Sequence, residues 1–310
     1  MAKRAVVVGI DNYMIFDPSG NNNLFNCVNS ARSMYHLLKD VFGFTEIYYY
    51  EDLQATRSRI LLALRHVLSI SEAGDSVCFY YAGHGTRQRA DFAQPDCDLY
   101  YEALVPAAEG VITDRDLSDL TANLYPDAVN FTVITDSCFS GGLHVSDSTA
   151  KCPSLPLAMD LLEAISNFMK TLIPCGVCLT APSEMSNNVS NVRVTPENTI
   201  DLDPDLNKTL VASCKSTLLS SCRFDEVSWI TTKYNHMIFT QSLLETINQS
   251  NFEASYHSVA DQVRQKVIDK ITSDILPGHP GITQTPQLFG QRNRMEENWL
   301  AGWTFTPANP

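Results

Sequence analysis

Apolar and polar positions along residues 1–140 predict strands that alternate with helices. Several short runs are apolar throughout, which is typical of strands buried on both faces of a parallel sheet. The segments between them place apolar residues at three- and four-residue spacing, the pattern of amphipathic helices. The predicted strands are residues 5–10, 46–52, 76–83 and 131–135, and the predicted helices are residues 27–44, 55–70 and 113–124, the last with Thr113 as N-cap. This order predicts an α/β fold with a mostly parallel sheet covered by helices.

The pattern loosens after residue 143 and becomes regular again near residue 216. Residues 181–208 are polar and nearly without periodicity, which predicts an exposed loop or linker. Around them we expect helices at 156–173, 237–247 and 255–271 and strands at 216–224 and 285–290. We therefore divide the chain into residues 1–145, a linker or insertion at 146–213, and residues 214–310, with both outer parts in one domain.

Composition and charge narrow the classes of partner. The formal net charge of −13 disfavours nucleic acid or an anionic membrane as the main partner. No run approaches the about 18 apolar residues of a membrane span. The first apolar run is short and meets Asp11, so a strand is favoured over a signal peptide. With nine scattered cysteines and no export signal, we expect a cytoplasmic protein.

Two of the predicted strands end in residues that suggest chemistry. SVCFYYAGHGT places His84 between two glycines, and FTVITDSCFSGG places Cys138 at the equivalent point after its strand. Neighbouring parallel strands bring their carboxyl ends to the same edge of the sheet, where ligands of open α/β sheets bind. An imidazole beside a thiol raises the fraction of thiolate, which is the nucleophile.

A purely structural role, or a different chemistry, accounts for these residues less well. A cysteine after a strand is commonly buried packing, and a histidine between glycines is commonly a turn residue, but both together favour catalysis. A thiol phosphatase would carry an arginine at position 144, where this chain has His144. The pair Cys175 and Cys178 has no second pair to complete a zinc site. No Gly-x-Ser-x-Gly elbow supports a serine hydrolase.

The two motifs resemble those of the caspase and metacaspase clan of cysteine peptidases, most closely metacaspases and bacterial orthocaspases. The resemblance extends to AVVVGIDNY, NCVNSARSMYHLL, EALVP with ITDRDL, LLSSCRFDEVSW, MIFTQSLLETI and TPQLFG. It implies a caspase-like three-layer αβα sandwich with a mostly parallel six-stranded sheet. It also implies a cysteine endopeptidase in which Cys138 is the nucleophile and His84 the general base and acid. The backbone amides of Gly85 and Cys138 would form the oxyanion hole.

The resemblance also implies an acidic pocket for the residue before the cleaved bond. Asp136 and Cys27 match that pocket, but its second acid is replaced by Ser30. We therefore expect a weakened preference for Arg and Lys, or tolerance of uncharged residues. Asp96, Asp98 and Asp225 are other acids that could take the place of the missing one.

The remaining expectations concern calcium binding, activation by cleavage and oligomeric state. Many metacaspases bind calcium through acids where this chain reads Asp114-Arg115-Asp116, and Arg115 would repel a cation. We expect no required cofactor; a calcium site at Asp98, Asp114 and Asp147 is the alternative. The sequence leaves two possibilities for the linker: it is cut after Lys151, Arg193, Lys208 or Lys215 for activation, or it remains intact as a lid or a partner-docking loop. We expect a protein or peptide substrate and a monomer rather than a dimer. A catalytically idle scaffold that binds a partner is the alternative function.

Overall fold

A computed structural model provides the fold. It describes residues 1–89, 100–121, 129–137, 150–151, 193–194, 200–201, 216–223, 226–250, 254–279, 281–290 and 292–301. The predicted helix at 156–173 lies outside these residues, as does most of the predicted linker. Among the described helices, none combines the length and apolar character that crossing a membrane requires.

A sheet of six strands forms the centre of the molecule, in the order β13-β11-β7-β3-β1-β2. The strands are β1 (Lys3–Gly9), β2 (Glu46–Glu51), β3 (Ser76–Ala82), β7 (Asn130–Asp136), β11 (Thr217–Ser220) and β13 (Gln287–Phe289). All neighbours pair in parallel except β11 and β13, which are antiparallel. Every residue of β3 and β7 is buried, as the apolar and β-branched residues in the middle of both strands predict. The predicted mostly parallel α/β sheet is confirmed.

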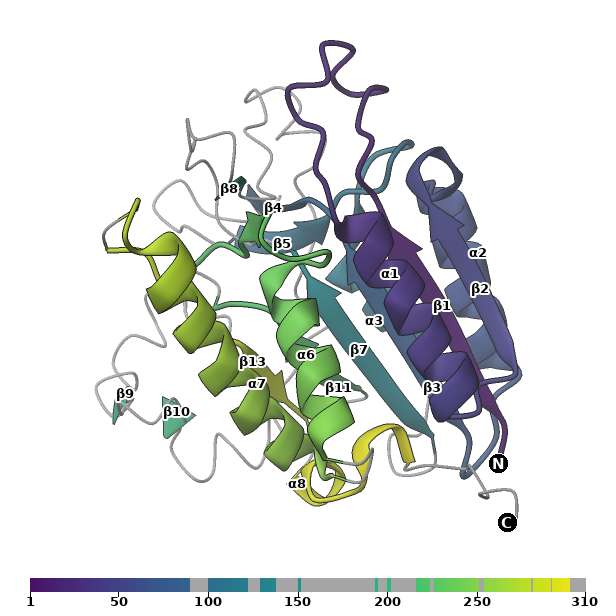
Figure 1. The fold of residues 1–310 in the computed structure, drawn as a ribbon. Helices are drawn as coiled ribbons and strands as arrows, with labels where there is room; N and C mark the ends of the chain where they lie inside the picture. Colours follow the sequence, from purple (N-terminus) through teal and green to yellow (C-terminus); the bar gives the residue numbers. More distant parts are fainter. Residues whose placement is uncertain are drawn as a thin grey trace.

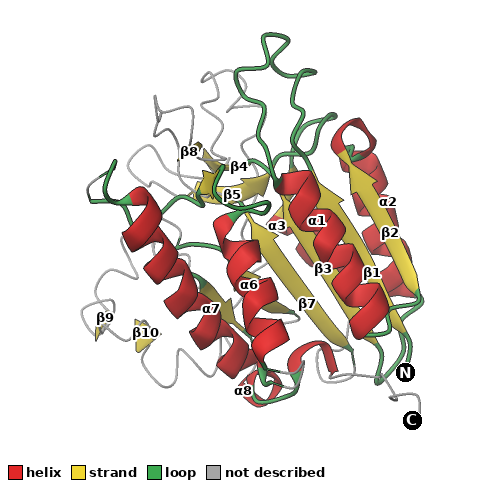
Figure 2. Ribbon diagram, in the orientation of Figure 1, coloured by secondary structure: helices red, strands yellow, loops and turns green. Residues whose placement is uncertain are grey.

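Helices cover both faces of this sheet (Figure 1). On one face lie α1 (Cys27–His36), α6 (Ile238–Gln249) and α7 (Tyr256–Lys270); on the other lie α2 (Arg57–Ser69) and α3 (Asp114–Thr121). The same three layers are visible by element type in Figure 2. Helix α1 packs closely on β1 because Gly9 has no side chain: a Cβ there would lie 2.6 Å from the Ala31 Cβ. Asp11 accepts hydrogen bonds from the first backbone N–H groups of α1, at Cys27 (2.8 Å) and Val28 (3.3 Å).

The remaining elements are short. After α1 comes a π-type turn, η1 (Leu37–Val41), so the predicted helix at 27–44 is less regular than expected. The predicted strand at 216–224 is only β11 in the structure. The other short elements are η2 (Asp52–Gln54), β8 (Ala150–Lys151), β9 (Arg193–Val194), β10 (Ile200–Asp201), β12 (Ile230–Thr231), η4 (Ile271–Ile275), α8 (Arg292–Met295) and η5 (Trp299–Ala301).

A second sheet, which the sequence pattern did not predict, lies beyond the carboxyl end of β3. It is antiparallel and consists of β4 (Gly85–Arg89), β5 (Tyr100–Leu104) and β6 (Ile112–Thr113). Charged and polar residues in GTRQR hide the period-two pattern by which strands are predicted. Thr113, the predicted N-cap, is the last residue of β6 and directly precedes α3.

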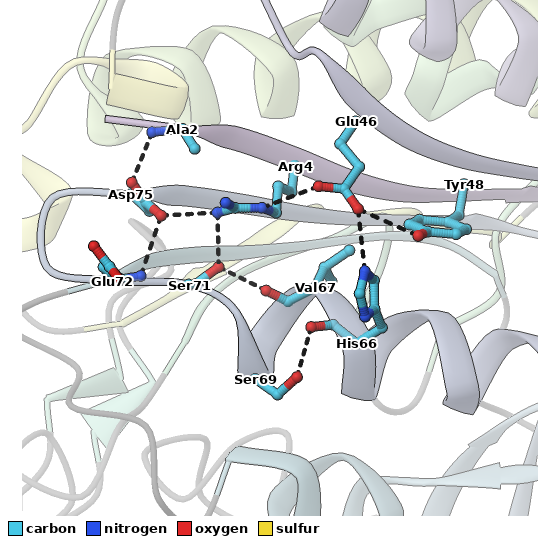
Figure 3. Close-up of polar contacts among 10 residues, drawn as sticks. All are labelled: Ala2, Arg4, Glu46, Tyr48, His66, Val67, Ser69, Ser71, Glu72 and Asp75. Carbon is cyan, nitrogen blue, oxygen red and sulfur yellow. Dashed lines mark hydrogen bonds and ion pairs between the residues drawn. The ribbon is translucent and has the colours of Figure 1, made fainter.

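The amino ends of the central strands are joined by a polar network (Figure 3). Arg4 in β1 donates to Glu46 in β2 (3.1 Å) and to Asp75 before β3 (2.7 Å). Glu46 also contacts His66 of α2 at 3.2 Å. This network lies at the amino ends of β1, β2 and β3, whereas His84 follows the carboxyl end of β3.

Candidate active site

The register of β3 and β7 places the two sequence motifs at the same edge of the sheet. Ala82 pairs with Asp136, and the Gly83 N–H donates to the Asp136 carbonyl at 3.3 Å. The described part of the chain thus brings Gly83, directly before His84, next to Asp136, which stands two positions before Cys138 in the sequence. Cys138 itself lies outside the described residues. The juxtaposition of His84 with Cys138 therefore stays a prediction, and the register establishes only that the strands preceding the two residues are neighbours.

The His84 side chain is almost fully buried, with 2% of it exposed. Its Nε2 lies 2.7 Å from the backbone carbonyl of Asn22, in the loop between β1 and α1. A carbonyl oxygen can only accept, so Nε2 carries the hydrogen. In the neutral imidazole this leaves the lone pair on Nδ1, which can accept a proton. Tyr13 packs edge-on against the imidazole, with ring centroids 4.4 Å apart.

Asp136 is fully buried at the end of β7 and is held by donors from the second half of the chain. Its Oδ1 accepts from the Ser228 hydroxyl (2.8 Å), and its Oδ2 accepts from the Thr240 backbone N–H (3.0 Å) and hydroxyl (2.6 Å). Burial raises the pKa of Asp136 to about 6, although the hydrogen bonds from Thr240 and Ser228 oppose that increase. The carboxylate is thus charged at neutral pH with most of its acceptor capacity in use.

Cys27 and Ser30 lie one turn apart in α1, and both are fully buried. The Ser30 hydroxyl accepts from the backbone N–H of Met237, directly before α6, at 3.0 Å. Burial raises the pKa of the Cys27 thiol, and the nearby carboxylates of Asp11 and Asp136 raise it further. Cys27 is therefore a neutral thiol, close enough to Asp136 to interact with its charge.

Gln284 joins the segments that surround Asp136, and no sequence motif singles it out. Its Oε1 accepts from the Trp229 backbone N–H (3.0 Å), while its Nε2 donates to the Ser221 carbonyl (3.1 Å) and the Ser228 hydroxyl (3.2 Å). Ser221 in turn exchanges hydrogen bonds with the backbone of Ser137, the residue before Cys138. A glutamine in a polar stretch carries no periodic signal, so only the fold reveals this role.

The structure describes some of the other predicted site residues and not others. Gly85 is buried at the start of β4, paired with Leu104. Asp114 is the first residue of α3, whereas Asp98 and Asp147 lie outside the described residues. Within the part of the chain that the structure describes, no three His, Cys, Asp or Glu side chains are grouped to hold a metal ion. The neighbouring Asp116 pairs with Arg57 at 2.7 Å.

The described cysteines do not compete for the role of nucleophile. Cys27, Cys78 and Cys222 are all buried. Burial raises the pKa of the Cys78 thiol, as it does that of Cys27. The Cys222 Sγ lies 3.6 Å from the carbonyls of Ser137 and Glu226. Buried neutral thiols are poor nucleophiles.

Comparisons of the sequence with known proteins find one family model and several related proteins. The family model of the caspase domain matches residues 2–295. The chain is 32% identical over 200 residues to metacaspase-7 of Arabidopsis thaliana, covering 57% of this chain and 47% of that protein. It is 36% identical over 168 residues to metacaspase-4 of the same plant, covering 49% and 38%. The matched segments thus span less than half the length of these two relatives.

Solved structures show the same fold. A protein of Geobacter sulfurreducens superposes with a TM-score of 0.64 at 18% identity, covering 97% of this chain and 99% of its own. Caspase-1 of Spodoptera frugiperda superposes with a TM-score of 0.52 at 12% identity, covering 93% and 86%. Because the family match extends over nearly the whole chain and the fold agrees with it, the protein belongs to the caspase-domain family.

Proposed function

We propose that the protein is a cysteine endopeptidase with Cys138 as nucleophile and His84 as general base and acid. The observation that supports the proposal is the parallel register of β3 and β7, in which Ala82, two residues before His84, pairs with Asp136, two residues before Cys138. The tautomer of His84 supports it, since Nε2–H is engaged by the Asn22 carbonyl and Nδ1 can take the thiol proton.

In the proposed reaction, His84 removes the proton of the Cys138 thiol, and the thiolate attacks the carbonyl carbon of the peptide bond. Backbone N–H groups of Gly85 and Cys138 stabilise the oxyanion of the tetrahedral intermediate. The intermediate collapses as His84 gives its proton to the leaving amine. Water, deprotonated by His84, then hydrolyses the thioester and releases the second product.

The proposed specificity pocket contains Asp136, Cys27 and Ser30. A carboxylate offers about four acceptor sites, and three donor groups already occupy Asp136. A substrate guanidinium could not form a bidentate pair there unless Ser228 or Thr240 gave way. Ser30 adds no charge. We therefore propose that Arg or Lys before the cleaved bond is preferred only weakly over uncharged residues of similar length.

We further propose a cytoplasmic monomer that acts on proteins or peptides without calcium. The ion pair between Asp116 and Arg57 supports calcium independence, because it engages one of the carboxylates of the acidic run. The ion also needs about six to eight oxygen ligands. Peptidase activity should therefore be the same with a strong calcium chelator and with added calcium.

The test compares the wild-type protein with Cys138→Ala and Cys222→Ala. Each is treated with a peptide chloromethyl ketone, analysed by intact-mass spectrometry, and assayed on a library of peptides. We expect one adduct and cleavage for the wild type and for Cys222→Ala, and neither for Cys138→Ala. No adduct and no cleavage in the wild type would instead favour a scaffold that binds a partner.

A further inference from the structure

Two buried tyrosines enclose the peptide unit of His84. The His84 backbone N–H donates to the Tyr13 hydroxyl at 2.8 Å. The Tyr81 hydroxyl lies 2.9 Å from the His84 carbonyl and 2.7 Å from the Val105 carbonyl. The two phenol oxygens are 3.4 Å apart, and both side chains are fully buried. The backbone N–H and the backbone carbonyl of His84 are therefore both hydrogen-bonded to phenol groups.

The direction of these hydrogen bonds follows from the groups involved. Carbonyl oxygens only accept, so Tyr81 directs its proton to a carbonyl and its oxygen is left to accept. Tyr13 accepts from the His84 N–H and can direct its own proton toward Tyr81. The chain of hydrogen bonds thus begins at the His84 N–H, passes through both phenols and ends at the carbonyls of His84 and Val105, which share the single Tyr81 proton.

The turn before His84 is shaped around these phenols. A Cβ on Gly83 would lie 2.5 Å from the Tyr13 hydroxyl and 2.9 Å from the Tyr81 hydroxyl. Only glycine leaves room for both oxygens at this position. Tyr13 is held in turn by its backbone N–H, which donates to the Asn23 side chain at 2.8 Å. Asn23 follows Asn22, whose carbonyl accepts from the His84 ring.

We propose that Tyr13 is a positioning residue for the catalytic histidine: through its hydroxyl and its ring it holds both the backbone and the imidazole of His84. The inference rests on the proposed peptidase function. Tyr13 touches neither substrate nor reacting atoms in this role. Its effect passes through the orientation of His84, and a shift of about 1 Å in a catalytic group can slow a reaction by about a hundredfold.

The pH profile of the peptidase should depend on how firmly this turn is held. The Asn22 carbonyl at Nε2 favours the charged imidazolium of His84, because it accepts a hydrogen bond that strengthens when the ring is charged. A loosened turn weakens that contact. The thiolate–imidazolium pair then exists over a narrower pH range.

The other titratable groups around the turn should not contribute to this change in the pH profile. Burial raises the pKa of Tyr13 and of Tyr81, and the pKa of Cys27 nearby is raised as well, so none of these groups titrates near neutral pH. Asp136 has a pKa of about 6, but the hydrogen bonds that lower it come from residues that a substitution at position 13 leaves in place. Burial also raises the pKa of Asp11, whose hydrogen bonds to α1 are likewise retained. A change in the pH profile of the peptidase therefore reflects the proposed dyad of His84 and Cys138.

The experiment compares Tyr13→Phe in the full chain with the matched control Tyr256→Phe. Tyr256 is also fully buried and also accepts a backbone N–H, from Leu300 at 3.1 Å, but it contacts the amino end of β7. For each protein, kcat and KM on one cleaved peptide are measured from pH 5 to 9, together with the unfolding midpoint. Tyr81→Phe serves as the second variant, because it removes one donor to the His84 carbonyl and leaves the Val105 N–H (3.0 Å) as the other.

For Tyr13→Phe we expect kcat to fall by about 10- to 100-fold with KM nearly unchanged, and the pH profile of kcat/KM to narrow. Tyr256→Phe should lower the unfolding midpoint without either change. Wild-type kcat and pH profile in Tyr13→Phe, or equal losses in Tyr256→Phe, would overturn the proposal. If Tyr13→Phe does not fold, Tyr81→Phe must show the same changes; failure of both to fold assigns the hydroxyls to stability alone and overturns it. A wild type that cleaves nothing refutes the proposed function itself.

Discussion

Asp136 owes its chemistry to its surroundings more than to its position in the motif. It follows a buried strand and is removed from water, and this burial raises its pKa to about 6. Three donor groups partly compensate the buried charge. An acid with a raised pKa is neutral below that value and charged above it, so the proposed pocket changes its charge within the working range of many peptidases.

This titration predicts a pH-dependent specificity. We expect the ratio of kcat/KM for a peptide with Arg to that for the same peptide with citrulline to rise by about fivefold as pH increases from 5 to 7.5. Citrulline has nearly the same shape and no charge, so the ratio cancels the titration of the dyad. In Asp136→Asn the ratio should not depend on pH. A flat ratio in the wild type would show that Asp136 does not face the substrate.

Ser30 provides the complementary test in the same pocket. In Ser30→Asp, a second carboxylate would stand one turn from Cys27 and could still accept from the Met237 N–H. We expect the Arg-to-citrulline ratio at pH 7.5 to increase by about tenfold, and the unfolding midpoint to fall because two like charges are buried together. Asn29→Asp adds the same charge to an exposed position of α1 and should change neither quantity. An unchanged ratio in Ser30→Asp would place residue 30 outside the pocket.

Among the elements, the carboxyl ends of β7 and β11 depend on a segment that precedes β13. Gln284 reaches from that segment to the Ser221 carbonyl after β11 and to the Ser228–Trp229 stretch before β12. All of these groups are buried, so each hydrogen bond that is lost leaves a polar group without water.

We predict that Gln284→Leu lowers the free energy of unfolding by about 1–3 kcal/mol, because the Trp229 N–H and the Ser221 carbonyl lose a buried partner. Urea denaturation monitored by circular dichroism measures the change. Gln287→Leu is the matched control, since the Gln287 amide is only half-buried and bonds to the carbonyls of Thr285 and Pro286. Equal effects in the two variants would contradict the prediction.

For the molecule as a whole, the described sheet has β2 and β13 as its edges. Strand β13 has three residues, and β2 begins and ends with Glu46 and Glu51. Short edges and charged edge residues disfavour pairing with a second copy. The net charge of −13 adds repulsion between copies.

We therefore predict one species of about the chain mass, 34.5 kDa, in sedimentation velocity experiments at physiological salt. The sedimentation coefficient should not change with protein concentration. Raising the salt concentration screens the repulsion and tests its contribution. A species of twice the mass at micromolar concentration would contradict the prediction.

Much of the fold follows from local sequence pattern. Apolar runs such as residues 76–83 indicate strands buried on both faces, and apolar residues at three- and four-residue spacing indicate a helix that covers a sheet. The confirmed order of strands and helices rests on these short-range signals. The antiparallel sheet of β4, β5 and β6 escaped prediction because its polar residues carry no clear period.

That His84 and Cys138 follow neighbouring strands of a caspase-like sheet could be predicted from the chain alone, because the motifs and the apolar runs that precede them are local. Their roles, and those of Asp136 and Ser30, remain predictions. The folded molecule was needed to find that Tyr13 and Asn22 hold His84 from 71 and 62 residues away, and that Ser228 and Thr240 hold Asp136 from 92 and 104 residues away. The reason is physical: periodicity records which face of an element is buried, whereas contacts between polar side chains depend on how distant loops and helices pack.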